Sequence, residues 1–111
     1  MLVVNRFRVP EPEAAVFRED LVRAHEVLAA QKGYVAGVVG RNVDDPELWT
    51  LATRWEHVGA YRRALSTYDA KLTAVPILSR ALDEPSAYEL VEPGAGLNEA
   101  VPRRFGPTET G

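Results

Sequence analysis

The chain has 111 residues, a formal net charge of −3 and no cysteine. A chain of this length predicts a single domain, and the lack of cysteine excludes disulfides, thiolate metal sites and cysteine nucleophiles. Since there is no basic surplus, neither nucleic acid nor an anionic membrane is the expected partner. With only two histidines and no dinucleotide-binding fingerprint in the chain, we expect neither a histidine-rich zinc site nor a nucleotide cofactor.

The N-terminal segment carries no recognisable targeting signal. Its apolar run ends at Val4 and is followed at once by Asn5 and Arg6, so the run is too short for the core of a signal peptide. No window approaches the roughly 20 apolar residues that a membrane span needs. We therefore expect a cytoplasmic protein without membrane contact.

The first third of the chain predicts a strand followed by a helix. Residues 2–9 alternate between two faces, as a strand does, and one face carries Val3, Asn5, Phe7 and Val9. After two prolines, apolar residues recur at steps of three and four, which predicts an amphipathic helix that Gly33 ends. The apolar stripe of this helix consists of Ala14, Phe17, Leu21, Ala24 and Leu28.

The middle of the chain predicts a hairpin and a second helical region. Residues 34–40 and 48–55 form two strands joined by a turn with the sequence Asp-Asp-Pro-Glu. The second helical region begins near Glu56 or His57 and is broken at Pro76, with one more helical turn over residues 77–82. Its predicted apolar stripe consists of Tyr61, Leu65, Tyr68, Leu72 and Val75.

The last predicted element is a short strand over residues 87–91. After Pro93 the composition shifts to glycine, proline and polar residues, so we divide the chain into a domain over residues 1–92 and a tail over residues 93–111. A tail of this composition is disordered by itself, unless it docks on the domain or on a partner.

The order of elements predicts an α+β fold of the ferredoxin-like βαββαβ type. In this fold two helices cover one face of a four-stranded antiparallel sheet. The other face carries Leu2 and Val4 of the first strand, so it is partly apolar and needs a cover. In a chain this short a second copy is the simplest cover, and we expect a homodimer.

Two polar residues interrupt the apolar patterns. Asn5 lies between apolar residues of the covered face, and a buried amide without partners costs about 1–3 kcal/mol. It therefore bonds either to a neighbouring segment or to a ligand between sheet and helices. His25 lies one step off the stripe of the first helix, where it is either a surface residue or a general base at the interior edge. His57 is expected to be an exposed residue at the start of the second helix.

Two aromatic residues complete the set of candidates. Trp55 ends the third strand, and Tyr61 follows on the second helix. They are either core aromatics or the walls of a flat aromatic cavity. The candidate catalytic residues are Asn5, His25, Trp55 and Tyr61. The candidate substrate-binding residues are Phe7, Leu21, Leu51 and Tyr68.

Four short motifs follow one another in the middle of the chain. They are Gly33-Tyr34, Asp45-Pro46, Trp55-Glu56 and Ala60-Tyr61. Their order and spacing resemble the antibiotic biosynthesis monooxygenase family, a branch of the dimeric α+β barrel superfamily. There too, a glycine ends the first helix, a hairpin turns at Asp-Pro, and a Trp-Glu strand end precedes a helix entered by Ala-Tyr or Ala-Phe. The resemblance covers residues 1–92 in element order and implies a dimeric α+β barrel.

The resemblance also implies roles for individual residues. The quinone-forming monooxygenases of polyketide pathways oxidise phenolic or anthrone substrates with molecular oxygen, without metal or flavin. Trp55 and Tyr61 look like the tryptophan and the tyrosine around their pocket. Those enzymes have a further Asn and an Arg near the positions of Leu51 and Val75.

Two other branches of the family share single features with the chain. Asn5 looks like the first-strand asparagine of the haem-degrading branch, but alanines, Ala64 and Ala74, stand near the positions of that branch's tryptophan and histidine. A third branch processes phosphorylated autoinducer-2 and places a histidine eight residues before the glycine. His25 and Gly33 reproduce that spacing.

The leading hypothesis is a cofactor-independent monooxygenase that acts on a small aromatic or polyketide-like substrate with molecular oxygen. Asn5 and Trp55 would bind the substrate oxygens, and His25 or Tyr61 would take the proton whose loss leaves an electron-rich carbanion. One alternative is a proton-transfer isomerase of a small carbonyl compound, with His25 as the base. Another is a non-catalytic ligand-binding dimer, in which Trp55, Tyr61 and Tyr68 belong to the core.

Overall fold

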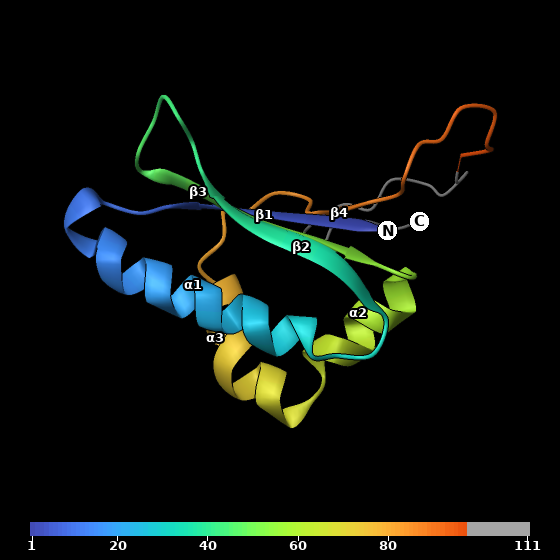
Figure 1. Ribbon diagram of the computed structural model, residues 1–111, viewed down its shortest axis with the longest axis horizontal. Coiled ribbons are helices and arrows are strands. Elements are labelled where there is room, and N and C mark those ends of the chain that lie inside the picture. Colours follow the sequence, from blue (N-terminus) through green and yellow to red (C-terminus); the bar gives the residue numbers. More distant parts are fainter. Residues whose placement is uncertain (98–111) are drawn as a thin grey trace, which may run out of the picture.

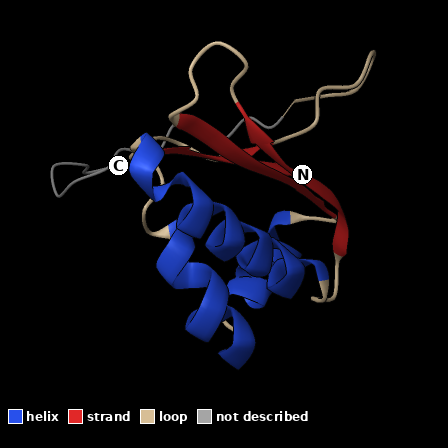
Figure 2. Cartoon of the chain, turned by 60° about the vertical axis from the view of Figure 1, so that its left-hand side comes forward, coloured by secondary structure: helices blue, strands red, loops and turns tan. Residues whose placement is uncertain are grey.

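A four-stranded sheet and a layer of helices against one of its faces make up the computed structural model, which describes residues 1–97 (Figures 1 and 2). The strands are β1 (Leu2–Arg8), β2 (Tyr34–Arg41), β3 (Leu48–Trp55) and β4 (Ala87–Tyr88). They lie in the order β2-β3-β1-β4, and each neighbouring pair is antiparallel. This order confirms the predicted ferredoxin-like fold.

The last strand is shorter than predicted. Its two residues pair with the start of β1, Tyr88 opposite Leu2 and Ala87 opposite Val3. Residues 89–97 are not part of a strand. The expectation of a strand over residues 87–91 is therefore wrong at its C-terminal end. Of the predicted tail, residues 93–97 are exposed, and residues 98–111 lie outside the described part.

The first helix, α1 (Ala14–Ala29), follows a short 3₁₀ turn, η1 (Glu11–Glu13), and agrees with its sequence pattern. The buried positions of α1 are Phe17, Leu21, Ala24 and Leu28, which confirms the predicted stripe. Gly33, where the chain turns into β2, has a φ of +90°. Glycine adopts this left-handed conformation without steric cost.

The second helical region is divided into α2 (Val58–Leu65), a π-helical turn, η2 (Ala70–Ala74), and α3 (Val75–Leu78). Pro76 does not end it, because this residue lies in the first turn of α3, where its missing N–H is not needed. No helix among residues 1–97 is long and apolar enough to cross a membrane.

The predicted apolar stripe of this region is only partly correct: Tyr61 and Leu65 are half-buried and pack against the core, but the later positions do not. Tyr68 is 77% exposed and Leu72 is 64% exposed. The buried positions are instead small, namely Ala60, Ala64, Ala70 and Ala74. The interruption at Ser66 and Thr67 and the wider π-helical turn shift the phase of the helix, and a face of alanines lets it approach α1 and the sheet closely.

The core lies between the helices and one face of the sheet. Register places Val3 opposite Thr53, Asn5 opposite Leu51 and Phe7 opposite Trp49. All six of these residues are buried, because successive side chains of a strand alternate between its faces. The candidate residues of β1 and β3 are thus brought to the face that the helices cover.

Candidate active site

Asn5 and Tyr61 form a polar pair under the helices. Asn5 is 8% exposed at the middle of β1, and its side chain hydrogen-bonds to the Tyr61 side chain. Burial raises the pKa of Tyr61, and the hydrogen bond from the Asn5 amide opposes part of that rise. The buried amide therefore has a partner within the chain, supplied by α2.

Trp55 lies beside this pair. Its ring centroid is 5.4 Å from that of Tyr61, and the residue is 2% exposed. The indole Nε1–H donates to Thr53 Oγ1 at 2.8 Å. Sequence reasoning missed Thr53, although a hydroxyl two residues before Trp55 on the same strand face is the available signal. The only side-chain donor of Trp55 is therefore engaged, and its ring is packed against that of Tyr61.

The second pair consists of His25 and Tyr34. His25 on α1 and Tyr34 at the start of β2 are joined by a 2.7 Å hydrogen bond between Nε2 and the hydroxyl oxygen. The Tyr34 ring meets Trp55 edge-on, with centroids 5.4 Å apart and an interplanar angle of 88°. Burial raises the pKa of Tyr34. The sequence signal for Tyr34 was its place directly after Gly33, but nothing there indicated a bond to His25.

These side chains form one continuous group, which we call the polar-aromatic cluster. Its members are Asn5, Tyr61, Trp55, Thr53, Tyr34 and His25. β3 lies between β1 and β2, so the cluster extends across the covered face by two strand spacings, about 10 Å. A hydrogen-bonding amide and tyrosine lie at one end, a histidine–tyrosine pair at the other, and a flat indole between them.

The predicted binding residues are only partly next to this cluster. Leu21 and Leu51 are fully buried, and Leu51 lies directly opposite Asn5. Phe7 is buried two residues further along β1, on the same face as Asn5. Its ring centroid lies 5.2 Å from that of Phe17. Tyr68, being largely exposed, lies outside the cluster.

His57 has the structural role expected for it. It is the N-cap of α2, and its Nδ1 accepts a hydrogen bond from the Ala60 amide at 3.1 Å. The residue is exposed. His25 is therefore the histidine that belongs to the cluster.

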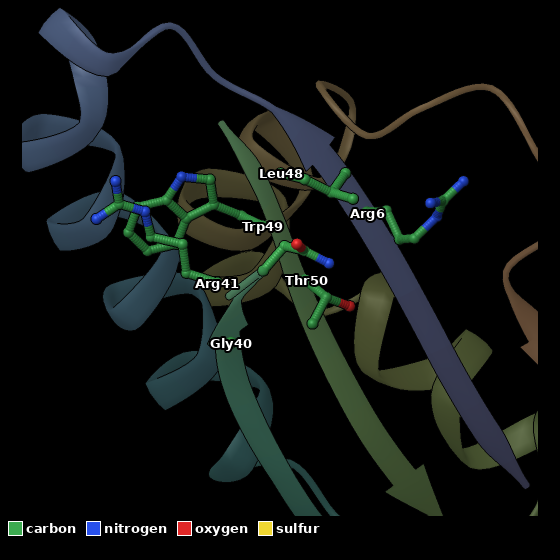
Figure 3. A pocket seen from close by; sticks show the side chains of 7 residues that line it. Arg6, Gly40, Arg41, Leu48, Trp49 and Thr50 are labelled. Carbon is green, nitrogen blue, oxygen red and sulfur yellow. The ribbon is translucent and has the colours of Figure 1, made fainter. Parts of the chain in front are cut away.

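A separate hollow of about 310 Å³ lies at the other end of β2 and β3 (Figure 3). Arg41 and Trp49 lie on the helix side of the hairpin there, with the guanidinium 5.4 Å from the centre of the indole ring. Trp49 Nε1 is buried and has no hydrogen-bond partner among residues 1–97. This hollow is not lined by any member of the cluster, so we do not assign the site to it.

Acidic and histidine side chains of the described part of the chain do not gather into a metal site. Within residues 1–97, no three His, Asp or Glu residues are placed so that they could hold one ion. What the cluster offers instead is hydrogen bonding to a substrate oxygen, stacking on an aromatic ring and proton transfer.

Comparison with known proteins places the molecule in a family. The family model described as antibiotic biosynthesis monooxygenase matches residues 1–74, which include β1 to β3 and the polar-aromatic cluster. The chain belongs to the antibiotic biosynthesis monooxygenase family. The match confirms the resemblance drawn from the four dipeptide motifs.

Several solved structures have the same fold as this chain. A variant of SnoaB, a cofactor-independent oxygenase from Streptomyces nogalater, is 26% identical, with a TM-score of 0.64 over 73% of this chain and 82% of that one. Another SnoaB structure is 22% identical, with a TM-score of 0.65 over 85% of this chain and 96% of that one. A conserved protein from Methanosarcina mazei is 21% identical, with a TM-score of 0.64 over 78% of this chain and 84% of that one. No curated protein matches the chain.

Proposed function

We propose that the protein is a cofactor-independent monooxygenase that oxidises a small aromatic or polyketide-like substrate with molecular oxygen. The observation that carries this proposal is the contact of Asn5, Tyr61 and Trp55 on the covered face of a monooxygenase-family fold. SnoaB, which is 26% identical in the variant compared, is a cofactor-independent oxygenase and supports the same chemistry.

The reaction begins with the loss of a proton from the substrate. An anthrone or hydroquinone that loses a proton becomes an electron-rich anion, which can transfer an electron directly to oxygen. Asn5 is placed to donate a hydrogen bond to the substrate oxygen on which negative charge develops. The ring of Trp55, which packs between those of Tyr61 and Tyr34, is the aromatic surface that we assign to the substrate ring. Because Trp55 is 2% exposed, the substrate reaches it only when one of these neighbours is displaced. Oxygen then adds to the substrate carbon, and loss of water gives the quinone.

His25 is better suited than Tyr61 to receive the proton. An imidazole accepts a proton near neutral pH. Burial raises the pKa of Tyr61, so the tyrosinate that could act as a base is disfavoured there. We therefore assign Tyr61 a binding role, together with Asn5, and assign His25 the basic role.

We also propose a homodimer formed through the open face of the sheet. A shallow hollow of about 220 Å³ on this face is lined by Leu2, Ala36, Val38 and Ala52, among others. Val38 is 63% exposed in the single chain. Exposed apolar side chains gathered on one sheet face are typical of an interface, and a second copy presents the same face.

Oxygen consumption tests the proposed reaction. A panel of anthrones and hydroquinones is offered to the protein in an oxygen electrode, and quinone formation is followed by absorbance. We expect Asn5→Ala to lower the rate by about 10²-fold or more and His25→Ala to lower it by at least as much. Trp55→Phe keeps an aromatic surface and should have the smallest effect of the three.

Val43→Ala is the matched control, because Val43 is 96% exposed in the turn of the hairpin. Its rate should equal that of the wild type. If no member of the panel consumes oxygen faster with the protein than without it, the monooxygenase proposal is wrong.

The His25–Tyr34 pair also favours a second candidate, a proton-transfer isomerase of a small carbonyl compound. Such an enzyme needs a proton acceptor and a polarising hydrogen bond, and the cluster has both. The two functions separate under argon. An isomerase converts its substrate at the same rate without oxygen, whereas a monooxygenase stops after deprotonation. If the protein does neither, both catalytic proposals are wrong, and a non-catalytic ligand-binding dimer is the remaining hypothesis.

A further inference from the structure

The hydrogen bond between His25 and Tyr34 lies directly against the backbone of β2. A Cβ atom added to Gly37 would lie 2.6 Å from the Tyr34 hydroxyl and 2.7 Å from His25 Nε2. A side chain at position 37 would displace the hydroxyl or the imidazole, so glycine at this position allows the two groups to meet where they do. Three parts of the chain contribute to the pair: α1 carries the histidine, the start of β2 carries the tyrosine, and the middle of β2 carries the glycine against which both side chains lie.

Tyr34 is the link between His25 and the rest of the cluster. The Tyr34 hydroxyl is hydrogen-bonded to His25 Nε2 at 2.7 Å. The Tyr34 ring contacts that of Trp55, with the two centroids 5.4 Å apart. The ring of His25 is 5.9 Å from that of Tyr34, at an angle of 49°. Since Nε2 is occupied by the tyrosine hydroxyl, that nitrogen receives a proton from the cluster only through this hydroxyl.

We propose that Tyr34 is a catalytic proton-relay residue, which passes the substrate proton to His25. This inference rests on the proposed function, because it concerns the deprotonation that both candidate reactions share. The bond between the substrate and its acidic hydrogen breaks, and a new O–H bond forms on Tyr34. At the same time the original Tyr34 O–H bond breaks, and an N–H bond forms at His25 Nε2. The products are a substrate anion, a neutral tyrosine and an imidazolium.

The surroundings of the tyrosine favour coupling of the two transfers. Burial raises the pKa of Tyr34, so a free tyrosinate is disfavoured as an intermediate. A histidine that accepts at Nε2 must carry its own proton on Nδ1. In this tautomer the tyrosine donates to the histidine, and its oxygen keeps a lone pair for the incoming proton.

The test measures deprotonation alone. Anthrone is incubated with the protein in D₂O under argon, and the loss of its C10 hydrogens is followed by NMR. We expect Tyr34→Phe and His25→Gln each to slow the exchange by about 10²-fold. The double variant should be no slower than the slower single variant, because both residues serve one transfer.

Tyr34→Phe keeps the ring that contacts Trp55, so its effect reports the hydroxyl. Gly37→Ala is the second variant, since it separates the hydroxyl from the imidazole without altering either group. Its exchange should also be slowed, with circular dichroism of all variants unchanged. Tyr88→Phe is the control, because it removes the hydroxyl of an exposed tyrosine on β4 and should leave the exchange rate unchanged.

The outcomes distinguish the relay from the function on which it rests. If the wild-type protein does not accelerate exchange, the proposed function fails at its first step. If the wild type is active and Tyr34→Phe stays within twofold of it, the function stands and the relay is wrong. The relay is also wrong if the losses of the two single variants multiply in the double variant.

Discussion

The two faces of the sheet come from the same strands, but helices cover only one of them, and the other is open in the single chain. On the covered face, two buried polar side chains have partners within the chain, since Trp55 donates to Thr53 and Asn5 bonds to Tyr61, whereas Trp49 Nε1 has none among residues 1–97. On the open face, Leu2 and Ala52 line a shallow hollow, and Val38 is 63% exposed. The comparison teaches that one face forms a buried core and a candidate site, whereas the other leaves apolar side chains exposed in a single chain. Four pairs of substitutions test this difference.

The largest expected effect comes from the same truncation on opposite faces. Leu51→Ala removes a fully buried side chain of the covered face and should lower the free energy of unfolding by about 2–5 kcal/mol. Leu2 is only partly buried on the open face, so Leu2→Ala should cost less than half as much. Urea unfolding at equal protein concentration measures both. Equal costs would show that the two faces are equally buried in the folded protein.

The next effect concerns two threonines of β3 on opposite faces. Thr53→Val removes the acceptor of the buried Trp55 N–H and should cost about 1–3 kcal/mol, since a buried donor is left unsatisfied. The Thr50 hydroxyl donates to the Asn5 carbonyl at 3.1 Å on the other face. Thr50→Val should cost about 1 kcal/mol or less, because Thr50 is only partly buried. Thermal unfolding by circular dichroism compares them, and the reverse order would contradict the assignment of faces.

The sequence was sufficient to predict the elements whose own pattern determines their burial. The alternation of β1 and the stripe of α1 are both seen in the structure. The pattern failed in the second helical region, where Tyr68 and Leu72 have helical spacing but face solvent. Hydrophobicity marks a helix face reliably only while the helix is regular, and the break near Thr67 and the π-helical turn change the phase.

The candidate site shows the same limit. The pattern placed Asn5, Trp55 and Tyr61 in one region because each has an identifiable position on its own element. The bonds among them depend on strand register and helix placement, which alternation does not specify. The pairing of His25 with Tyr34 in particular requires the glycine at position 37 to lie beneath both side chains. The sequence shows that a glycine stands within the strand, but it does not show which side chains lie against that glycine.

A charge on the open face should change assembly more than it changes the chain itself. Val38→Lys places a cation in the apolar patch and should abolish the proposed dimer, because burying an unpaired charge is costly. Secondary structure should be retained, since Val38 is 63% exposed in the single chain. Sedimentation velocity measures the mass of the species. Val43→Lys adds the same charge at the hairpin turn and should leave the mass unchanged. A wild-type protein that sediments as a monomer at all concentrations would refute the dimer.

The smallest expected effect lies at the rim of the open face, where Arg6 binds Glu84 through two hydrogen bonds of 2.7 and 2.6 Å. The hydrogen bonds from Arg6 lower the pKa of Glu84 from its ordinary value of 4.5. A carboxylate whose pKa is lower in the folded state stabilises that state above its unfolded pKa, and this contribution is lost as the pH falls through the folded pKa. Glu84→Gln should therefore lower the melting temperature slightly at pH 7, with the difference shrinking below about pH 4.5.

Melting temperatures between pH 7 and pH 3 measure this effect in the wild type and the variant. Arg6→Gln is the matched background, because Glu84→Gln should have no further pH-dependent effect once the guanidinium is gone. The pair is solvent-exposed, with 42% and 30% of the two side chains accessible, so screening by water keeps its contribution small. A difference between wild type and Glu84→Gln that is constant from pH 7 to pH 3 would mean that the contact acts through packing alone. The rim would then be held to β1 by its backbone bonds, from Leu82 N–H to the Arg6 carbonyl and from Val4 N–H to the Ser86 carbonyl.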